Sequence, residues 1–247
     1  MFDIAFLQHD GRHRLRDEER RLQEVLTARG IPIELYTIKR IHRRDLPLTR
    51  RSFIAGDMDA MHGAMNQLGI DIPPVNDYPA CLQAFMHRKI WKSTLGAIEQ
   101  MDWDVGLPPV FVKPAERRKS FTGRVFSSSS DFHWTSGASR RQSVWCSDVV
   151  TWLSEFRVYV IHDRVVSVDH YDGAAQRTLD MDVVHEALAV HRASGEAPSA
   201  YGIDFGVLSS GETALIEAND GYALGAYSIA AEAYTDLVLQ RWSELVS

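Results

Sequence analysis

The stretch YGIDFGVLSSGETALIEANDGYALGAY, residues 201–227, decides the fold of this chain. Its first part runs apolar, Ser-Ser-Gly-Glu breaks the run, and the residues that follow alternate between apolar and polar, which predicts two strands joined by a turn. Strict alternation puts Leu215, Glu217 and Asn219 on one face of the second strand, while Asp204 lies between apolar neighbours on the first. Three oxygen-bearing side chains therefore belong to strands of buried character.

Carboxylates on buried strands are unfavourable unless a cation neutralises them. Mg²⁺ is the simplest such cation, because it accepts carboxylate and amide oxygens and keeps coordination positions for phosphate and water. The pattern therefore predicts a metal site made of Asp204, Glu217 and Asn219, which Mn²⁺ would also suit. The alternative interpretation is a hairpin whose polar side chains face solvent.

Composition bounds the class of protein. The chain has 247 residues, 45% of them hydrophobic, enough for one large or two modest domains, and a net charge of −6. It contains neither a run of eighteen apolar residues nor a basic segment followed by an apolar one at the N-terminus, so a soluble, cytoplasmic protein is expected. Cys81 and Cys146 lack zinc or redox spacing and are expected to be structural thiols.

The N-terminal region has the pattern of β-α-β units. A strand, a helix, a strand and then a second strand-helix pair are predicted at 3–7, 12–29, 31–36, 53–56 and 57–68. Asp57 is placed to cap the last of these helices. Strands that alternate with helices in this way build a parallel sheet.

The most basic part of the chain, Lys39–Arg51, lies within this region. Its side chains can contact phosphates or carboxylates of a partner. It has no interleaved aromatic residues, so a base-stacking platform is not expected, and the negative net charge argues against nucleic acid as the partner. A solvated loop countered by Glu34 and Asp45 is the simpler interpretation.

Lysines and arginines gather after a proline-containing boundary at 73–79. The pattern at 80–100 predicts a helix carrying Arg88, Lys89 and Lys92. These cations lie within about one turn of each other, so two of them can face one anion.

A strand with a single lysine follows. Residues 110–114 have buried character except for Lys113, and Pro114 indicates that the strand ends there or lies at an edge. The cationic turn 116–123 does not match the GxxxxGK[ST] phosphate loop. Its cations, hydroxyls and backbone N–H groups can nonetheless cover phosphates, although a plain surface hairpin has the same pattern.

The second half of the chain continues with strands. An extended apolar run at 144–150 precedes a clear hairpin, in which Glu155 and Arg157 share a strand face. A helix capped by Asp180 follows, and 229–246 are expected to form a closing amphipathic helix.

The order of these elements resembles one family. A helix with lysines, a Val-x-Lys-Pro strand, a cationic hairpin, an arginine-bearing hairpin and strands with Asp, Glu and Asn follow one another as in the ATP-grasp superfamily. FVKP at 111–114 and SFTG at 120–123 look like the clade of that superfamily that is named for two arginines and a lysine. The resemblance covers nearly all of the chain from Arg88 onward. It implies an α/β (α+β) ATP-grasp fold, with a pre-ATP-grasp domain at 1–79 and an ATP-grasp domain at 80–247, the latter with lobes at about 108–150 and about 151–247.

The resemblance also implies roles for the matching residues. Asp204, Glu217 and Asn219 match the magnesium ligands, and Arg157 and Lys113 match residues that act on the phosphates of ATP. Residues implied in nucleotide binding are Lys89 as first and Lys92 as second candidate, Lys113, the hairpin residues Lys119, Ser120, Thr122 and Gly123, the adenine segment Ser147, Asp148, Val149 and Val150, and Glu155.

A function follows from the resemblance: a ligase that uses ATP and Mg²⁺. Such enzymes activate a carboxylate as an acyl phosphate, which an amine or similar nucleophile attacks to form an amide. The expected partners are a small-molecule or peptide carboxylate and an amine, with no membrane. Two alternatives stay open: a kinase on the same fold, and a non-catalytic module that binds nucleotide or nucleic acid.

The chain departs from the family in a hairpin richer in arginine than glycine, and in Asp220-Gly221 where Pro-Gly usually follows the Asn.

Overall fold

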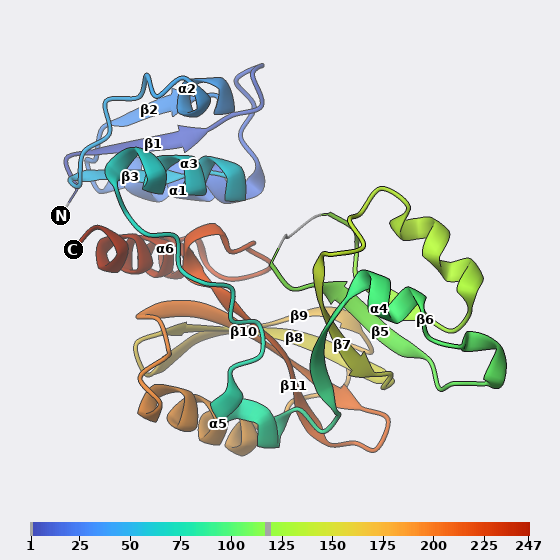
Figure 1. The fold of residues 1–247 in the computed structure, drawn as a ribbon. Coiled ribbons are helices and arrows are strands. Elements are labelled where there is room, and N and C mark those ends of the chain that lie inside the picture. The colour runs from blue at the N-terminus through green and yellow to red at the C-terminus, as the bar shows by residue number, and fades with distance from the viewer. Residues whose placement is uncertain (1, 117–119) are drawn as a thin grey trace.

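Three separate β-sheets organise the chain (Figure 1). The computed structural model describes residues 2–116 and 120–247. The N-terminal sheet has the strand order β2-β1-β3, the middle sheet β4-β7-β5-β6 and the C-terminal sheet β11-β10-β8-β9. Both ends of the chain lie on the same side of the molecule, beside the N-terminal sheet (Figure 1).

The N-terminal sheet is parallel, as the β-α-β pattern predicted. Its strands are β1 (Ile4–Gln8), β2 (Ile33–Tyr36) and β3 (Ser52–Ala55), and its helices are α1 (Asp17–Ala28), α2 (Ile38–His42) and α3 (Met58–Leu68). The predicted cap of α3 is confirmed, because the Asp57 side chain accepts a hydrogen bond from the Ala60 amide at 3.0 Å. Gly69 ends this helix at φ 66°, a left-handed conformation that glycine adopts without strain.

The middle sheet is antiparallel and includes a strand that the sequence did not predict. Its strands are β4 (Ile90–Thr94), β5 (Val110–Pro114), β6 (Arg124–Phe126) and β7 (Ser143–Asp148). The helix expected over 80–100 is wrong: a 3-10 helix at Ala80–Phe85 and the short helix α4 (Leu95–Glu99) flank β4. Pairing along the whole of β7 overrides the local helical pattern.

The C-terminal sheet carries the stretch that opened the sequence analysis. Its strands are β8 (Trp152–Ile161), β9 (Arg164–Gly173), β10 (Ala200–Leu208) and β11 (Thr213–Asp220), and α5 (Met181–Ala193) covers one face. The predicted hairpin of β8 and β9 and the Asp180 cap of α5 are confirmed.

A bulge in β11 changes which residues share a face. Asp204 pairs with Glu217 whereas Phe205 pairs with Leu215, so Ile216 is the extra residue. Leu215 is therefore buried with Phe205 in the core against α5, and the prediction that it shares a face with Glu217 is wrong. Glu217 stays on the opposite face, directly across from Asp204.

The closing helix α6 (Ala231–Val246) joins the first and last sheets. It lies between the N-terminal and C-terminal sheets in Figure 1 and contacts α1, β3, β8 and β10. Trp242 is fully buried and its indole N–H donates to the Ser52 carbonyl at 2.8 Å. One hydrophobic cluster thus spans the first sheet and α6, and the expected domain boundary at residue 79 stays a prediction.

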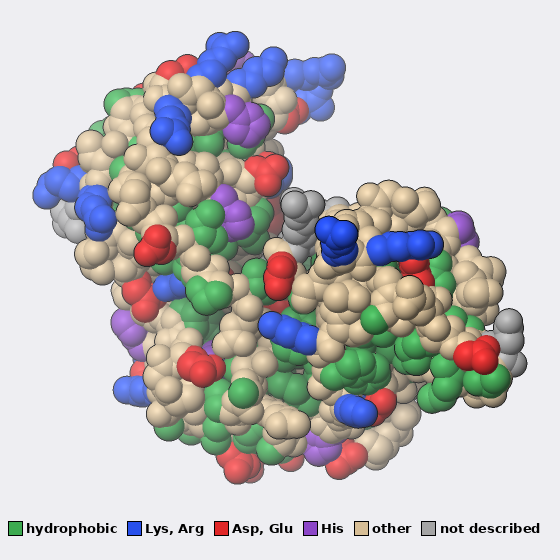
Figure 2. All heavy atoms as spheres, viewed as in Figure 1, with side chains coloured by type: hydrophobic (Ala, Val, Ile, Leu, Met, Phe, Trp, Pro, Cys, Tyr) green, Lys and Arg blue, Asp and Glu red, His purple; other side chains and the backbone are tan. Residues whose placement is uncertain are grey.

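The basic stretch Lys39–Arg51 has acidic neighbours, as the interpretation of it as a solvated loop predicted. Lys and Arg side chains gather on the outside of the N-terminal unit (Figure 2). Within Lys39–Arg51, Arg40 pairs with Glu34 and Asp45, the two counter-charges that the sequence suggested.

Both cysteines are free thiols. In the described residues, no helix combines the length and apolar character needed to cross a membrane.

Candidate active site

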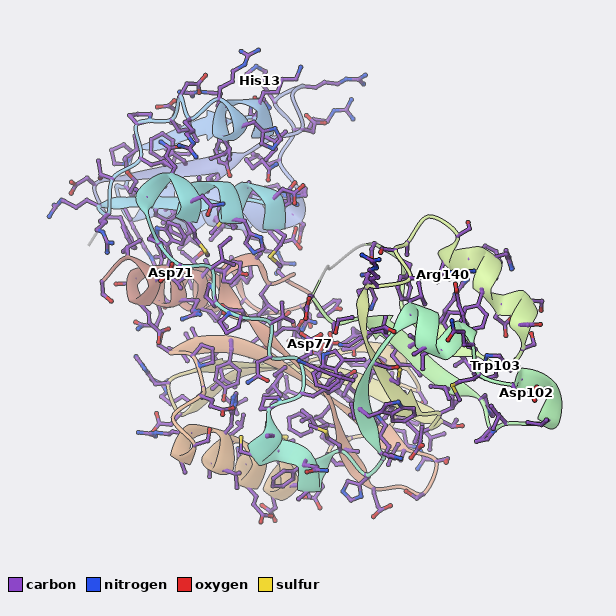
Figure 3. All side chains as sticks on the ribbon, viewed as in Figure 1. His13, Asp71, Asp77, Asp102, Trp103 and Arg140 are labelled. Carbon is purple, nitrogen blue, oxygen red and sulfur yellow. The ribbon has the colours of Figure 1, made fainter. Side chains whose placement is uncertain are left out.

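Lys113 of β5 connects the middle sheet to the C-terminal sheet. Its ammonium Nζ lies 2.5 Å from Glu217 Oε2 on β11 and 2.7 Å from Asp77 Oδ2. Asp77 comes from the segment that follows the N-terminal unit, and Figure 3 shows it between the strands of the two sheets. Residues from three distant parts of the chain therefore meet at one ammonium group.

Alternation along β5 explains the direction of the Lys113 side chain. Val110 and Val112 are buried in the core on one face of the middle sheet, so Lys113 projects from the other. On this opposite face, which we call the cleft face, Lys113 and Lys92 lie on either side of Trp145, in register with it. Lys92 Nζ stands 4.7 Å from the centre of the Trp145 ring.

The environment of Lys113 favours its charged form. Only 12% of its side chain is exposed, and this burial lowers the pKa. The charges of Glu217 and Asp77 outweigh burial, so that the pKa of Lys113 lies above its usual value. A raised pKa keeps the ammonium of Lys113 in its charged form at neutral pH.

Arg157 and Asp204 form a buried pair on neighbouring strands of the C-terminal sheet. Arg157 Nε and Nη2 donate to the two oxygens of Asp204 at 2.8 and 2.7 Å, a bidentate arrangement. Their side chains are 11% and 3% exposed. Burial raises the pKa of Asp204 and the Arg157 guanidinium opposes that rise.

The predicted metal set comes together around Asn219. Its amide nitrogen lies 3.3 Å from Asp204 Oδ2 and 3.3 Å from Glu217 Oε1. In the described residues, no cluster of three or more His, Cys, Asp or Glu is placed to hold a metal. Two carboxylates and an amide oxygen, which a turn of the Asn219 amide would present in place of its nitrogen, suit Mg²⁺, since this ion takes a few protein oxygens and completes its shell with phosphate and water.

The charges of this set are already compensated within the protein. Arg157 neutralises Asp204, and Lys113 neutralises Glu217. A divalent cation that bound here would compete with Lys113 for the Glu217 carboxylate.

Glu155 lies on the same strand face as Arg157, as predicted, since both alternate with the buried Phe156. Its Oε2 accepts a hydrogen bond from the Tyr171 hydroxyl at 2.8 Å, and burial raises its pKa. The Tyr171 ring stacks on Tyr227 at 4.9 Å, and the Arg157 guanidinium stands 5.1 Å from the Tyr227 ring centre. Glu155 is thus linked through Tyr171 to Tyr227, the aromatic residue beside the Arg157 guanidinium.

The structure separates the two lysines that the sequence ranked together. Lys89 is exposed and its Nζ lies 5.3 Å from the ring of Trp91, which packs into the core on the far side of the middle sheet. Lys92 instead lies on the cleft face with Lys113. The structure brings Lys92 to the other candidate residues and leaves Lys89, the first candidate, apart from them.

The predicted hairpin joins β5 to β6. Ser120 and Thr122 are exposed, and Ser120 Oγ accepts a hydrogen bond from Gln142 at 2.5 Å. Gly123 packs so closely on β5 that an added Cβ would come within 3.0 Å of Lys113 Cβ. Lys119 lies outside the described residues.

The predicted adenine segment lies at the end of β7, where the chain leaves the middle sheet for β8. Ser147 is buried, Asp148 and Val149 are exposed and Val150 is half-buried. The Asp148 side chain accepts from the Lys89 amide at 3.0 Å and so fixes the start of β4. The segment connects the middle sheet to the C-terminal sheet, and its role in binding adenine stays a prediction.

A cleft opens between the N-terminal unit and the middle sheet. It has a volume of about 780 Å³, and its lining includes Lys92, Glu116 and Ser120 on one side and His62 and Tyr222 on the other. Figure 2 shows the hollow in this place. His62 Nε2 and the Tyr222 hydroxyl lie 2.9 Å apart, which ties α3 to the turn after β11.

Sequence reasoning missed three residues of the site. Asp77 and Tyr78 follow Pro73-Pro74 and were treated only as a boundary, yet Lys113 Nζ lies 2.7 Å from Asp77 and 4.5 Å from the Tyr78 ring centre. Arg88 was named as a cation without a role. Its guanidinium donates to the carbonyls of Leu215 and Ile216 at 2.7 and 2.9 Å, and so holds the bulge that aims Glu217. For Asp77 and Tyr78, the sequence offered only one signal, an acidic residue directly before an aromatic one.

Solved structures with the same fold extend over almost the whole chain. A RimK-domain ATP-grasp protein of Sphaerobacter thermophilus is 16% identical with a TM-score of 0.63, over 96% of this chain and 99% of that one. The D-alanine-D-alanine ligase of Bacillus anthracis is 12% identical with a TM-score of 0.61, over 100% and 99%. The ATP-grasp ligase PsnB in complex with a minimal precursor is 14% identical with a TM-score of 0.55, over 97% and 100%. Identities this low show the fold alone.

At the level of sequence, no curated protein matches this chain. A family model does match, over residues 85–237, and it describes an ATP-grasp domain, family 2 of the clade named for two arginines and a lysine. The match spans more than half of the chain and includes the Lys113 strand, the Arg157 strand and both strands of the predicted metal set. The chain belongs to the ATP-grasp superfamily, in the second family of that clade.

Proposed function

We propose that this protein is an ATP- and Mg²⁺-dependent ligase that joins a carboxylate to an amine. A carboxylate oxygen of the substrate attacks the γ-phosphorus of ATP, and ADP leaves. The amine nitrogen then attacks the acyl carbon, inorganic phosphate leaves and the nitrogen loses a proton. The net products are an amide, ADP and phosphate.

The convergence of charged groups from two sheets carries this proposal. Lys113 from the middle sheet contacts Glu217 of the C-terminal sheet at 2.5 Å, and Arg157 holds Asp204 beside it. Two fixed cations so placed stabilise negative charge that develops during phosphoryl transfer. We assign the catalytic roles to Lys113 and Arg157.

The oxygen donors are assigned to the metal. Asp204, Glu217 and Asn219 would hold Mg²⁺, with Asn219 3.3 Å from each carboxylate. When bound, the metal supplies charge neutralisation for the phosphates of ATP. Arg157 would keep Asp204 oriented, while Glu217 would exchange its contact with Lys113 for the metal.

Further contacts to the nucleotide follow from the faces of the middle sheet. Lys92 shares the cleft face with Lys113, and we assign it, rather than Lys89, to the phosphates. The segment Ser147–Val150 is assigned to the adenine side. The hairpin residues Ser120, Thr122 and Gly123 are assigned to a cover over the phosphates, since an acyl phosphate needs protection from water.

The substrate class is proposed as an amino acid or a peptide. Ligases with this fold include one named for D-alanine and one solved with a precursor peptide. The cleft of about 780 Å³ beside Lys92 lies within the range of volumes that small-molecule sites occupy.

The first test is a thermal-shift measurement with ATP, with and without Mg²⁺. A ligand that binds only the folded state raises its stability, by about 2.7 kcal/mol at a concentration a hundred times its dissociation constant. We expect a magnesium-dependent rise that Glu217→Gln abolishes, and that Glu244→Gln, which changes a carboxylate paired with Arg241 on α6, leaves intact. No response of the unmodified protein to Mg-ATP would contradict the proposal.

The second test is ADP release in the presence of amino acids and short peptides. A ligase releases ADP only when both a carboxylate and an amine are present, and mass spectrometry then finds an amide. A stable phosphorylated product that forms without any amine would instead identify a kinase.

A further inference from the structure

Asp77 and Tyr78 hold Lys113 from outside either sheet. They are consecutive residues of the segment between the N-terminal unit and the middle sheet. Asp77 contributes a carboxylate 2.7 Å from Lys113 Nζ, and Tyr78 contributes a ring whose centre lies 4.5 Å from the same atom. The ammonium therefore contacts this pair as well as Glu217.

Backbone and ring contacts fix the position of this pair. The Asp77 carbonyl accepts the Ala218 amide at 2.8 Å, so the segment lies along the edge of β11. The Tyr78 ring packs edge-on against Trp145 at 5.1 Å. Asp77 and Tyr78 are 6% and 9% exposed. A carboxylate in such a setting has little freedom to follow a moving partner, so it defines where Lys113 Nζ can be.

The two carboxylates around Lys113 differ in what else they have to do. Glu217 lies 3.3 Å from Asn219 and belongs to the proposed metal set, so it would turn from Lys113 toward the metal if Mg-ATP bound. Asp77 does not belong to the proposed metal set. An ammonium has three N–H donors, so one donor can stay on Asp77 while another reaches a phosphate oxygen.

We propose that Asp77 is a positioning residue that holds the Lys113 ammonium in place for the phosphates of ATP when Glu217 turns to the metal. This inference rests on the proposed function, because it takes Lys113 as a phosphate contact. It ties nucleotide binding to the segment that leads out of the N-terminal unit. Asp77 itself acts through Lys113 and makes no contact with the nucleotide.

The test compares ligands with and without phosphate. Isothermal titration calorimetry measures the affinity of Asp77→Asn, an isosteric variant without the charge, for Mg-AMPPNP, AMP and adenosine. We expect affinity for the two phosphate-bearing ligands to fall about tenfold, the lower end for a hydrogen bond to a charged group. Adenosine should bind unchanged, because it offers Lys113 no anion. Asp77→Glu, which restores a carboxylate, should recover most of the loss.

Each other outcome overturns the inference in a recognisable way. Equal weakening of all three ligands means that Asp77 has a purely structural role. Tighter binding of AMP by Asp77→Asn means that Asp77 competes with phosphate for Lys113. Unchanged affinities mean that Glu217 alone positions the lysine.

Matched measurements separate these outcomes from failure of the proposed function. If the unmodified protein binds none of the ligands, the nucleotide site itself is absent and the proposed function fails. Glu244→Gln serves as the control, since it also removes one charge from a cation-paired carboxylate, on α6. It should leave every affinity within about twofold, because the partners of Glu244 are Arg241 and Ser199, outside the proposed nucleotide and metal residues.

Discussion

The charged cluster around Lys113 and Arg157 and the basic stretch Lys39–Arg51 differ in burial more than in charge. The side chains of Arg157 and Asp204 are 11% and 3% exposed, whereas those of Arg40 and Glu34 are 34% and 40% exposed. Both regions hold arginine-carboxylate pairs at short distances. The cluster brings together residues from three parts of the chain, while Arg40 pairs with residues only a few positions away. Burial and convergence mark the site, and a high density of charge in the sequence does not.

The largest effect is expected from breaking the most buried pair. Arg157→Met leaves the Asp204 carboxylate, 3% exposed, without its guanidinium. Loss of one partner of a buried pair costs about 3 kcal/mol or more. Urea denaturation should show this loss as a lower midpoint.

The double variant Arg157→Met with Asp204→Leu checks the cause. Replacing both charges with apolar groups of similar volume removes the unpaired carboxylate and should recover most of the stability, though not the response to Mg-ATP. If Arg157→Met unfolds at the same urea concentration as the unmodified protein, the burial of this pair does not determine its effect on stability.

Lys113→Met comes next, with a loss of about 2 kcal/mol in unfolding free energy. It leaves Asp77 and Glu217, with side chains 8% and 29% exposed, without the cation between them. Glu217→Gln keeps the Lys113–Asp77 contact and should cost much less. Parallel urea titrations compare the two, and equal losses would show that Glu217 matters to the fold as much as Lys113 does. Glu217→Gln would then be a structural variant as well as one that affects nucleotide binding.

The two faces of the middle sheet allow a smaller and sharper test. Lys92→Met should weaken Mg-AMPPNP binding about tenfold, as for loss of one charged hydrogen bond. Lys89→Met removes the same charge only three positions away, on the other face, and should bind as the unmodified protein does. Calorimetry on both variants decides between them, and the reverse result would restore Lys89 as the phosphate lysine.

The smallest effect is expected in the basic stretch. Arg43→Ser with Arg44→Ser changes exposed side chains, so the unfolding midpoint should stay within about 1 °C and Mg-AMPPNP affinity should not change. Filter binding to RNA and DNA at several salt concentrations tests whether the stretch binds nucleic acid. Tight, salt-sensitive binding that the double variant abolishes would give the stretch a role of its own.

Features encoded by neighbouring residues could be predicted from the sequence. The parallel N-terminal sheet, the Asp57 cap, the hairpin of β8 and β9 and the alternation of Glu155 with Arg157 all follow from local periodicity. The order of the motifs in the sequence predicted the family, and the matching family model confirms it. Local patterns act over a few residues, and these features need nothing more.

Features that depend on distant partners could not be predicted. The helix expected over 80–100 yields to a strand because β7 lies alongside it, and the face of Leu215 changes because β11 has a bulge that alternation does not encode. Asp77 reaches Lys113 only through the folded arrangement of two sheets. Similarly, the choice between Lys89 and Lys92 needed the strand that sequence periodicity concealed.

Helix α6 has a consequence for how the protein is made. The ribosome synthesises β1, β2 and β3 early, yet Leu237 and Trp242 of α6, both fully buried, complete the core under those strands. Until α6 has emerged, the nascent N-terminal unit exposes an apolar surface that the finished protein hides. Folding of the first part therefore has to wait for the later one, and chaperone binding to stalled nascent chains should persist until α6 leaves the exit tunnel.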